Sequence, residues 1–206
     1  MAPPNWNFVA GSYAMTVART SPQREGPRYG EGRTALLAAA VHVGATQGLR
    51  HLTYRSVAAE AGVAHGLVAH HFGTRDALIE EALQYSLEHG VASLSSAPGS
   101  GDVEALFVGV QTWFEQETDD AVFQYELILE SRRRPALRPH VERLYQAYRE
   151  ALHTELQACG LPDDPDLVHL VFAALDGLVF QQVSLGETEA TQGALDRLRG
   201  LLGRLR

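Results

Sequence analysis

The sequence predicts an all-α protein in which a three-helix head with a helix-turn-helix precedes a larger helical body. Apolar residues recur at helical spacing from residue 32 onward, and no strand-like alternation interrupts them. Residues 93–101, rich in Ser, Gly and Pro, separate the head from the body. A chain of 206 residues suits a small domain joined to a larger one. We expect three parts: a flexible tail (1–28), a helix-turn-helix domain (29–76) and a helical body (77–206).

The head begins with an amphipathic helix. Residues 1–28 hold four prolines and no sustained helical period, so a mobile tail is expected ahead of this helix. The helix is predicted to start at Gly32 and to end at Gly48. Its apolar stripe comprises Leu36, Leu37, Ala40, Val41 and Gly44.

Two short helices follow. Thr53 suits the N-cap of the first, because its hydroxyl can accept a hydrogen bond from a free amide of the first turn. Gly62 ends that helix, since a tight connection is easiest at glycine. The second helix is predicted from about Ala64 to His71, and Thr74 then caps a fourth helix that continues to Leu87. A helix-turn-helix of this kind places one helix in the DNA major groove.

The body is expected to contain five further helices. They cover residues 103–114, 122–129, 141–156, 167–185 and 194–205. The fourth of them is apolar on more than one face, and leucine recurs along the last. No uninterrupted apolar run of membrane-spanning length and no signal-peptide pattern is found, so we expect a cytoplasmic protein with no membrane partner.

Charge is divided unevenly along the chain. The formal net charge is −8, yet residues 33–75 hold four arginines and one acidic residue. From residue 81 onward, ten arginines stand against 20 acidic residues. This asymmetry predicts a head that faces DNA and an acidic body that the phosphates repel. The single cysteine, Cys159, cannot form an internal disulfide and is expected to fill space in a helix.

Several motif elements in the head occur in a fixed order. They are Gly48-Leu49, Thr53, Val57-Ala58, Ala61-Gly62-Val63, Gly66, His71-Phe72 and Thr74-Arg75-Asp76 with Leu78. In this order they resemble the TetR family of transcriptional regulators. The resemblance implies a small DNA-binding head and a divergent helical body that binds a ligand and forms a dimer. We therefore expect a repressor that a small-molecule effector releases from DNA, with no enzymatic activity and no cofactor.

The head departs from the family pattern at three positions. Ala64 stands where the family usually has Ser or Thr, which loses an N-cap worth ~1 kcal/mol. Ala69 stands where the family usually has a Tyr that bonds phosphate, a loss of ~1.5–3 kcal/mol per half-site. Arg75 replaces the usual Lys. Imidazole donors nearby can offset the lost contact, namely those of His65, His70 and His71.

The predicted DNA-binding residues follow from these positions. They are Thr53, Tyr54, Arg55, His65, Gly66, Ala69, His70, His71 and Arg75. We expect Arg55 and His65 to reach base edges, and the other polar side chains to contact phosphates. The apolar residues of the third helix are expected in the core: Leu67, Val68 and Phe72.

The adjacent histidines His70 and His71 have two other interpretations, a polar helix face and a metal site. Metal binding is disfavoured because adjacent helix residues point about 100° apart. No Cys or Glu stands at ligand spacing either. No metal site is expected.

The body is predicted to hold a cavity, mostly apolar with a few polar tips, as small-molecule sites are. The candidate lining residues are Trp113, Phe123, Glu126, Tyr145, Tyr148, His169 and Phe172. Each alone is more often a core residue, and the family resemblance favours the cavity. Glu126 is the expected polar contact if the ligand is cationic.

The last two helices are predicted to form a homodimer as a four-helix bundle. Gly177 costs ~1 kcal/mol relative to Ala within a helix, which indicates close helix approach. The predicted interface comprises Asp176, Gly177, Val179, Leu198 and Leu202. A two-fold dimer predicts double-stranded DNA with an inverted-repeat operator.

The rival interpretation is a helical enzyme or interaction scaffold whose helix-turn-helix is incidental. It needs a catalytic constellation, and the sequence displays none. The acidic pairs Glu80-Glu81, Asp119-Asp120 and Asp163-Asp164 lie at helix ends, where they favour the helix dipole.

Overall fold

The computed structural model describes residues 29–116 and 118–206, with side chains over 32–112 and 118–206. Nine α-helices, two short 3-10 helices and no strand occur in these ranges. The elements are α1 (Tyr29–Gln47), η1 (Leu49–His51), α2 (Tyr54–Glu60), α3 (His65–Phe72), α4 (Arg75–Ala92), α5 (Val103–Gln116), α6 (Thr118–Ser131), η2 (Pro135–Leu137), α7 (Arg138–Ala158), α8 (Pro165–Leu185) and α9 (Thr188–Leu202). The predicted all-α fold is confirmed, and the tail predicted over 1–28 lies outside the described residues.

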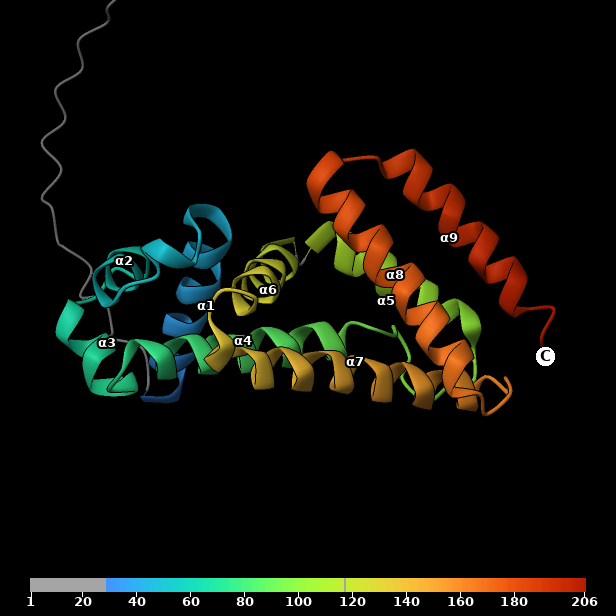
Figure 1. Ribbon diagram of the computed structural model, residues 1–206, viewed down its shortest axis with the longest axis horizontal. Helices are drawn as coiled ribbons and strands as arrows, with labels where there is room; N and C mark the ends of the chain where they lie inside the picture. The colour runs from blue at the N-terminus through green and yellow to red at the C-terminus, as the bar shows by residue number, and fades with distance from the viewer. Residues whose placement is uncertain (1–28, 117) are drawn as a thin grey trace, which may run out of the picture.

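The helices form an elongated molecule with the helix-turn-helix at one end. Figure 1 shows α2 and α3 at that end and α8 and α9 at the other. Helix α4 leaves the helix-turn-helix and packs alongside α7, while α6 packs against α1. We call α1–α3 the head and α5–α9 the body. Helix α4 therefore links the two.

The apolar core is continuous from the head into the body. Phe123 of α6 is fully buried and packs against Gly44 of α1, where there is no room for a side chain. Leu127 and Leu144, from α6 and α7, join the same cluster as the head residues. Truncating a buried Phe costs ~3–5 kcal/mol, so Phe123 is a main source of stability at this junction. The sequence predicts that Phe123 binds ligand, whereas the structure places its side chain inside this core cluster.

Four helices begin three or more residues before the predicted start, namely α1, α6, α7 and α9. Helix α8 ends at Gly186, whose φ of 69° lies in the left-handed region. Helix α9 then begins at Thr188 instead of Ala194, because its first turn is polar and carries no apolar stripe to reveal it. Helix α1 begins at Tyr29, three residues before the predicted start.

Helix α8 is unusually apolar. It is long and apolar enough to cross a membrane by length and composition alone, with a mean hydropathy of 1.5 over its most apolar stretch. The sequence prediction placed a helix here but found no membrane-spanning run, because His169 and Asp176 interrupt its apolar residues. Only 22% of that stretch is buried within the protomer. Much of the apolar surface of α8 is therefore open to a partner.

Candidate functional site

The helix-turn-helix is fixed by hydrogen bonds at the predicted positions. Thr53 caps α2 in a capping box with Ser56: the Ser56 amide donates to the Thr53 hydroxyl at 3.2 Å, and the Thr53 amide donates to the Ser56 hydroxyl at 2.9 Å. Gly62 makes the turn with φ of 67°. Thr74 caps α4 by accepting from the Ala77 amide at 3.0 Å. These predictions are confirmed.

Helix α3 begins after Ala64, which provides no side-chain cap, as predicted. His65, Gly66 and His70 are exposed on it, and Ala69 and His71 are partly exposed. Val68 and Phe72 are buried as expected. Leu67 is 38% exposed, so the prediction that it belongs to the core is wrong. It lies one residue from Gly66 and widens the exposed face of the helix.

The side chains predicted to contact DNA differ in their exposure and in the hydrogen bonds that they already make. Arg55 is exposed, whereas the Tyr54 hydroxyl is buried and has no hydrogen-bond partner among the described residues. The guanidinium of Arg75 donates to the Leu52 carbonyl at 2.7 Å and also to the Leu49 carbonyl. Arg75 thus holds the turn at η1, a role that sequence spacing could not reveal.

Charged contacts tie the body to the head and to α4. His42 of α1 lies with Nδ1 2.6 Å from Asp119 of α6 and with Nε2 3.8 Å from Glu60 of α2. The hydrogen bond to Asp119 is the main cause that raises the pKa of His42. Arg134, which follows α6, pairs with Asp76 of α4 at 2.8 Å. These contacts position the head relative to the body.

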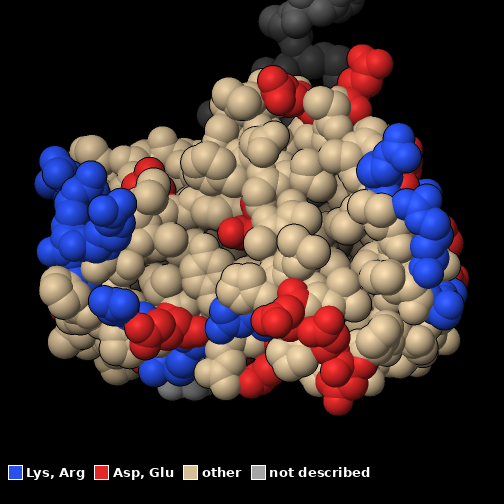
Figure 2. All heavy atoms as spheres, turned by 45° about the vertical axis from the view of Figure 1, so that its right-hand side comes forward, with Lys and Arg blue, Asp and Glu red and all other residues tan. Residues whose placement is uncertain are grey.

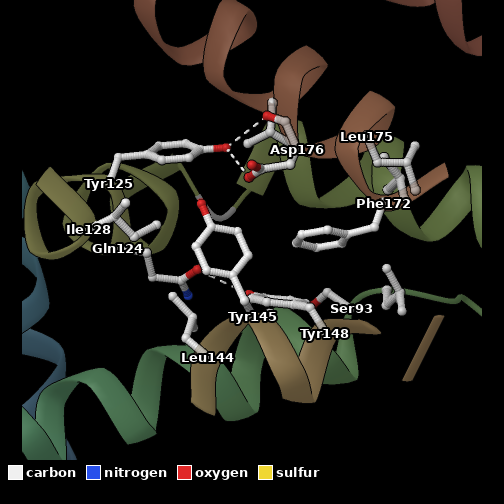
Figure 3. A pocket seen from close by; sticks show the side chains of 14 residues that line it. Ser93, Gln124, Tyr125, Ile128, Leu144, Tyr145, Tyr148, Phe172, Leu175 and Asp176 are labelled. Atoms are coloured by element: carbon white, nitrogen blue, oxygen red, sulfur yellow. Dashed lines mark hydrogen bonds between the residues drawn. The ribbon is translucent and has the colours of Figure 1, made fainter. Parts of the chain in front are cut away.

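The body holds a cavity of about 70 Å³ between α4, α6, α7 and α8. Its wall is mainly apolar and aromatic (Figure 3). Four rings contribute, those of Tyr125, Tyr145, Tyr148 and Phe172. The Tyr145 and Phe172 rings meet edge to face, with centroids 5.6 Å apart. Small-molecule sites usually measure ~300–1,000 Å³, so a ligand of ordinary size has to widen this cavity.

Asp176 of α8 supplies a carboxylate to this aromatic wall. The Tyr125 hydroxyl lies 2.9 Å from a carboxylate oxygen of Asp176 and 2.9 Å from its backbone carbonyl oxygen (Figure 3). Burial raises the pKa of Asp176, although hydrogen bonds from Tyr125 and Tyr145 oppose that shift. Burial also raises the pKa of Tyr125, so this phenol stays protonated and can donate. The carboxylate is therefore held by hydroxyl donors, and no Arg, Lys or His is among the described residues that line its pocket.

The opposite end of the pocket carries a neutral hydrogen-bond chain. The Tyr148 hydroxyl donates to Gln124 Oε1 at 3.2 Å, and Gln124 Nε2 donates to the Ser86 hydroxyl at 2.8 Å. Gln124 and Ser86 are buried. Burial raises the pKa of Tyr148 as well. The pocket thus has an acidic end and a neutral polar end.

Three of the seven predicted ligand residues line this pocket: Tyr145, Tyr148 and Phe172. Glu126 is exposed and lies outside the wall, and His169 is exposed in a surface groove between α7 and α8. Trp113 lies outside the residues whose side chains are described. Sequence reasoning missed Tyr125, and it assigned Asp176 to the dimer interface. Both differences concern which face of a helix points inward.

The predicted dimer residues also divide between two faces. Asp176 and Val179 line the pocket, Leu202 is buried within the protomer, and Leu198 packs partly against the same core. A Cβ atom added at Gly177 would meet nothing within 4 Å inside the protomer, so close approach by a helix of the same protomer does not explain this glycine. The large apolar residues exposed on α8 and α9 are Leu170, Phe180, Leu185 and Leu201.

No group of three or more His, Cys, Asp or Glu side chains among the described residues could hold a metal ion. His42, Glu60 and Asp119 come close together, but the two carboxylates lie at different ring nitrogens of His42. The two candidate sites are therefore the exposed face of α3 and the aromatic pocket.

Two family models match the chain. Residues 36–82 match "Bacterial regulatory proteins, tetR family", and residues 101–204 match "Tetracyclin repressor-like, C-terminal domain". No match was found among curated proteins.

Solved structures of the same fold are similar over most of the chain. A TetR family member from Streptomyces coelicolor A3 is 30% identical, with a TM-score of 0.67, covering 85% of this chain and 98% of the other. A transcriptional regulator from Rhodococcus sp. Rha1 is 28% identical, with a TM-score of 0.68, covering 82% and 94%. The multidrug binding protein EbrR, solved with proflavin, is 30% identical, with a TM-score of 0.57, covering 85% and 100%. On its sequence, its fold and these matches, the chain belongs to the TetR family of transcriptional regulators.

Proposed function

We propose that this regulator is a cytoplasmic homodimeric repressor that binds an inverted-repeat operator and is released by a planar aromatic cation. The observation that carries the effector class is Asp176, the one carboxylate among the described residues that line the aromatic pocket. The protein acts by binding, without catalysis.

DNA recognition is assigned to the exposed face of α3 and the start of α2. His65 and His70 are exposed on α3. Arg50 of η1 and Arg55 of α2 are also exposed. Arginine and imidazole donors suit both base edges and phosphates. Tyr54 remains a candidate through its backbone amide at the α2 N-terminus, which favours anions, whereas the Thr53 amide already donates to Ser56.

A cationic effector suits the pocket for two reasons. A carboxylate in an apolar site attracts a cation more strongly than one in water does. Aromatic faces also attract cations, by ~0.5–2 kcal/mol each. EbrR, which is 30% identical, was solved with proflavin and, in another structure, with ethidium. Both ligands are planar aromatic cations, which supports the same class here.

Release follows from the position of the pocket. Its wall includes α4, the helix that begins directly after the helix-turn-helix. A ligand that widens the cavity displaces α4 or the helices packed on it. A dimer needs its two recognition helices at a fixed separation to bind two half-sites, so a displaced α4 lowers operator affinity. The effector needs only to bind the displaced state more tightly.

The dimer is assigned to the uncovered face of α8 and α9. Leu170, Phe180, Leu185 and Leu201 expose large apolar side chains there. Figure 2 turns this end of the molecule forward and shows a broad middle that is mostly uncharged, with a few acidic atoms within it and most charged residues nearer its edges. An uncharged centre with a polar rim is typical of protein interfaces. Gly177 lies in this stripe, with room beside it for a partner helix.

The test begins with DNA. The purified protein should select fragments of its own genome that share an inverted repeat, read by sequencing. Proflavin should then release the protein from a selected fragment. Protection of an asymmetric single site by a monomer, or operator binding that proflavin leaves unchanged, would contradict the proposal.

A further inference from the structure

Tyr148 rests directly on the backbone of α4. A methyl group added to Gly90 would overlap the Tyr148 hydroxyl and lie 2.9 Å from Cζ. Nonbonded carbon atoms do not approach so closely. The glycine at position 90 therefore makes the space in which the tyrosine lies.

A second path joins the same side chain to α4. The Tyr148 hydroxyl donates to Gln124 at 3.2 Å, and Gln124 donates to Ser86 at 2.8 Å. Ser86 and Gly90 are four residues apart, so they share one face of α4. Both are buried there. Tyr148 packs directly on that face at Gly90. It reaches the same face at Ser86, one turn earlier, through the hydrogen bonds of Gln124.

The other side of the Tyr148 ring belongs to the pocket. It stacks on Phe172 with ring centroids 6.4 Å apart and an angle of 26° between the planes. Tyr148 thus stands between the ligand cavity and α4 (Figure 3).

We infer that Tyr148 is the positioning residue that transmits pocket occupancy to α4. This inference rests on the proposed function and names the contact through which release occurs. A ligand that widens the cavity pushes the Tyr148 ring, and close packing on Gly90 leaves the ring nowhere to move without displacing α4. The start of α4 carries the recognition helix, so its displacement reaches the DNA-binding surface.

The inference predicts that Gly90→Ala imitates the effector. The new methyl group should force Tyr148 and α4 apart and weaken operator binding at least tenfold with no ligand present. In a Tyr148→Ala background, the same substitution should change operator affinity less than twofold, because the clashing ring is gone. Gln84→Ala, on the exposed face of α4, is the matched control and should leave affinity unchanged. Unchanged affinity in Gly90→Ala, or an equal effect in both backgrounds, would overturn the inference.

A second variant keeps the test independent of the folding of Gly90→Ala. Tyr148→Phe keeps the ring but removes the hydroxyl that joins it to Gln124 and Ser86. Proflavin fluorescence in the absence of DNA gives the dissociation constant of the dye for each protein. The proflavin concentration that releases the operator, divided by that dissociation constant, should be at least tenfold higher in the variant than in wild type. Release that follows binding in the same ratio as in wild type would overturn the inference.

The same measurements distinguish failure of the proposed function from failure of the inference about Tyr148. If the proposed function fails, wild type itself binds no operator, or proflavin does not release it. Failure of the inference alone leaves wild type released by proflavin while the Gly90 and Tyr148 variants behave as wild type does.

Discussion

The Tyr125 hydroxyl lies 2.9 Å from the carboxylate of Asp176, across the gap between α6 and α8. The contact holds an acid inside an aromatic pocket, where burial raises its pKa. Such an arrangement costs stability while the acid is charged and no cation is bound. It is therefore better explained by a ligand than by folding.

Asp176→Asn should stabilise the unliganded protein at neutral pH. The folded-state pKa of Asp176 is raised, so its contribution to stability is fully present below the unfolded pKa and is lost as pH rises through the folded pKa. The amide imitates the neutral acid at every pH. The melting temperature of the variant should exceed that of wild type at pH 7, and the gap should narrow toward pH 4.5. Thermal unfolding of both proteins across this pH range tests the prediction. A difference in melting temperature that does not depend on pH would contradict a raised pKa of Asp176.

Arg55 and Arg75 should have separable roles. Arg55→Ala should cost ~1–3 kcal/mol at one base position if the side chain pairs bidentately with guanine. Arg75→Ala should weaken all sequences alike and also lower the urea midpoint, since Arg75 holds the carbonyls of Leu49 and Leu52. Operator titrations across salt separate the two. A salt slope that falls by about one in Arg75→Ala would instead indicate a direct phosphate contact.

Operator affinity should rise as pH falls from about 8 to 6. Phosphate favours protonated imidazole, so complex formation takes up protons if His65 and His70 face the backbone. A His65→Gln, His70→Gln variant should lose this dependence. His42 also has a raised pKa, so its contribution to head stability is present at low pH and is lost as pH rises through that pKa. His42→Gln is therefore the control, which separates the stability of the head from protonation at the DNA. A wild-type operator affinity that does not change with pH would rule out protonation at the DNA.

Gly177→Gln should yield a folded monomer. A Cβ atom at this position meets nothing within 4 Å inside the protomer, so a larger side chain is expected to clash only with a partner helix. Sedimentation should show half the wild-type mass, with an unchanged circular dichroism spectrum. Leu129→Glu alters an exposed leucine of α6 and should remain dimeric. A dimeric Gly177→Gln protein would place the interface elsewhere.

The local features of the head were predictable from sequence because they depend on short-range chemistry. Thr53, Gly62 and Thr74 act through hydrogen bonds or backbone conformations within four residues. The hydrogen bonds of Arg75 were harder to predict, because its carbonyl partners lie 23 and 26 residues away in the sequence. Its contact depends on how α4 packs on η1.

The residues of the pocket were harder still to predict, since its geometry depends on how the body helices cross. Glu126 and Tyr125 are neighbours, yet the rotation of about 100° between adjacent helix positions directs only Tyr125 into the pocket. Asp176 and Gly177 differ in the same way on α8. Periodicity shows that a helix has an apolar stripe, but α8 is apolar on several faces, so the pattern does not select the inward one.

The most direct test is an operator titration with and without proflavin, on wild type and two carboxylate variants. Asp176→Asn should bind operator as wild type does but need at least tenfold more proflavin for release, a loss of about 1.4 kcal/mol. Glu126→Gln alters an exposed carboxylate outside the pocket and should match wild type. Because dye and DNA are the same in every titration, intercalation cannot account for a difference between proteins. Equal release of wild type and Asp176→Asn would contradict recognition of a cation by Asp176.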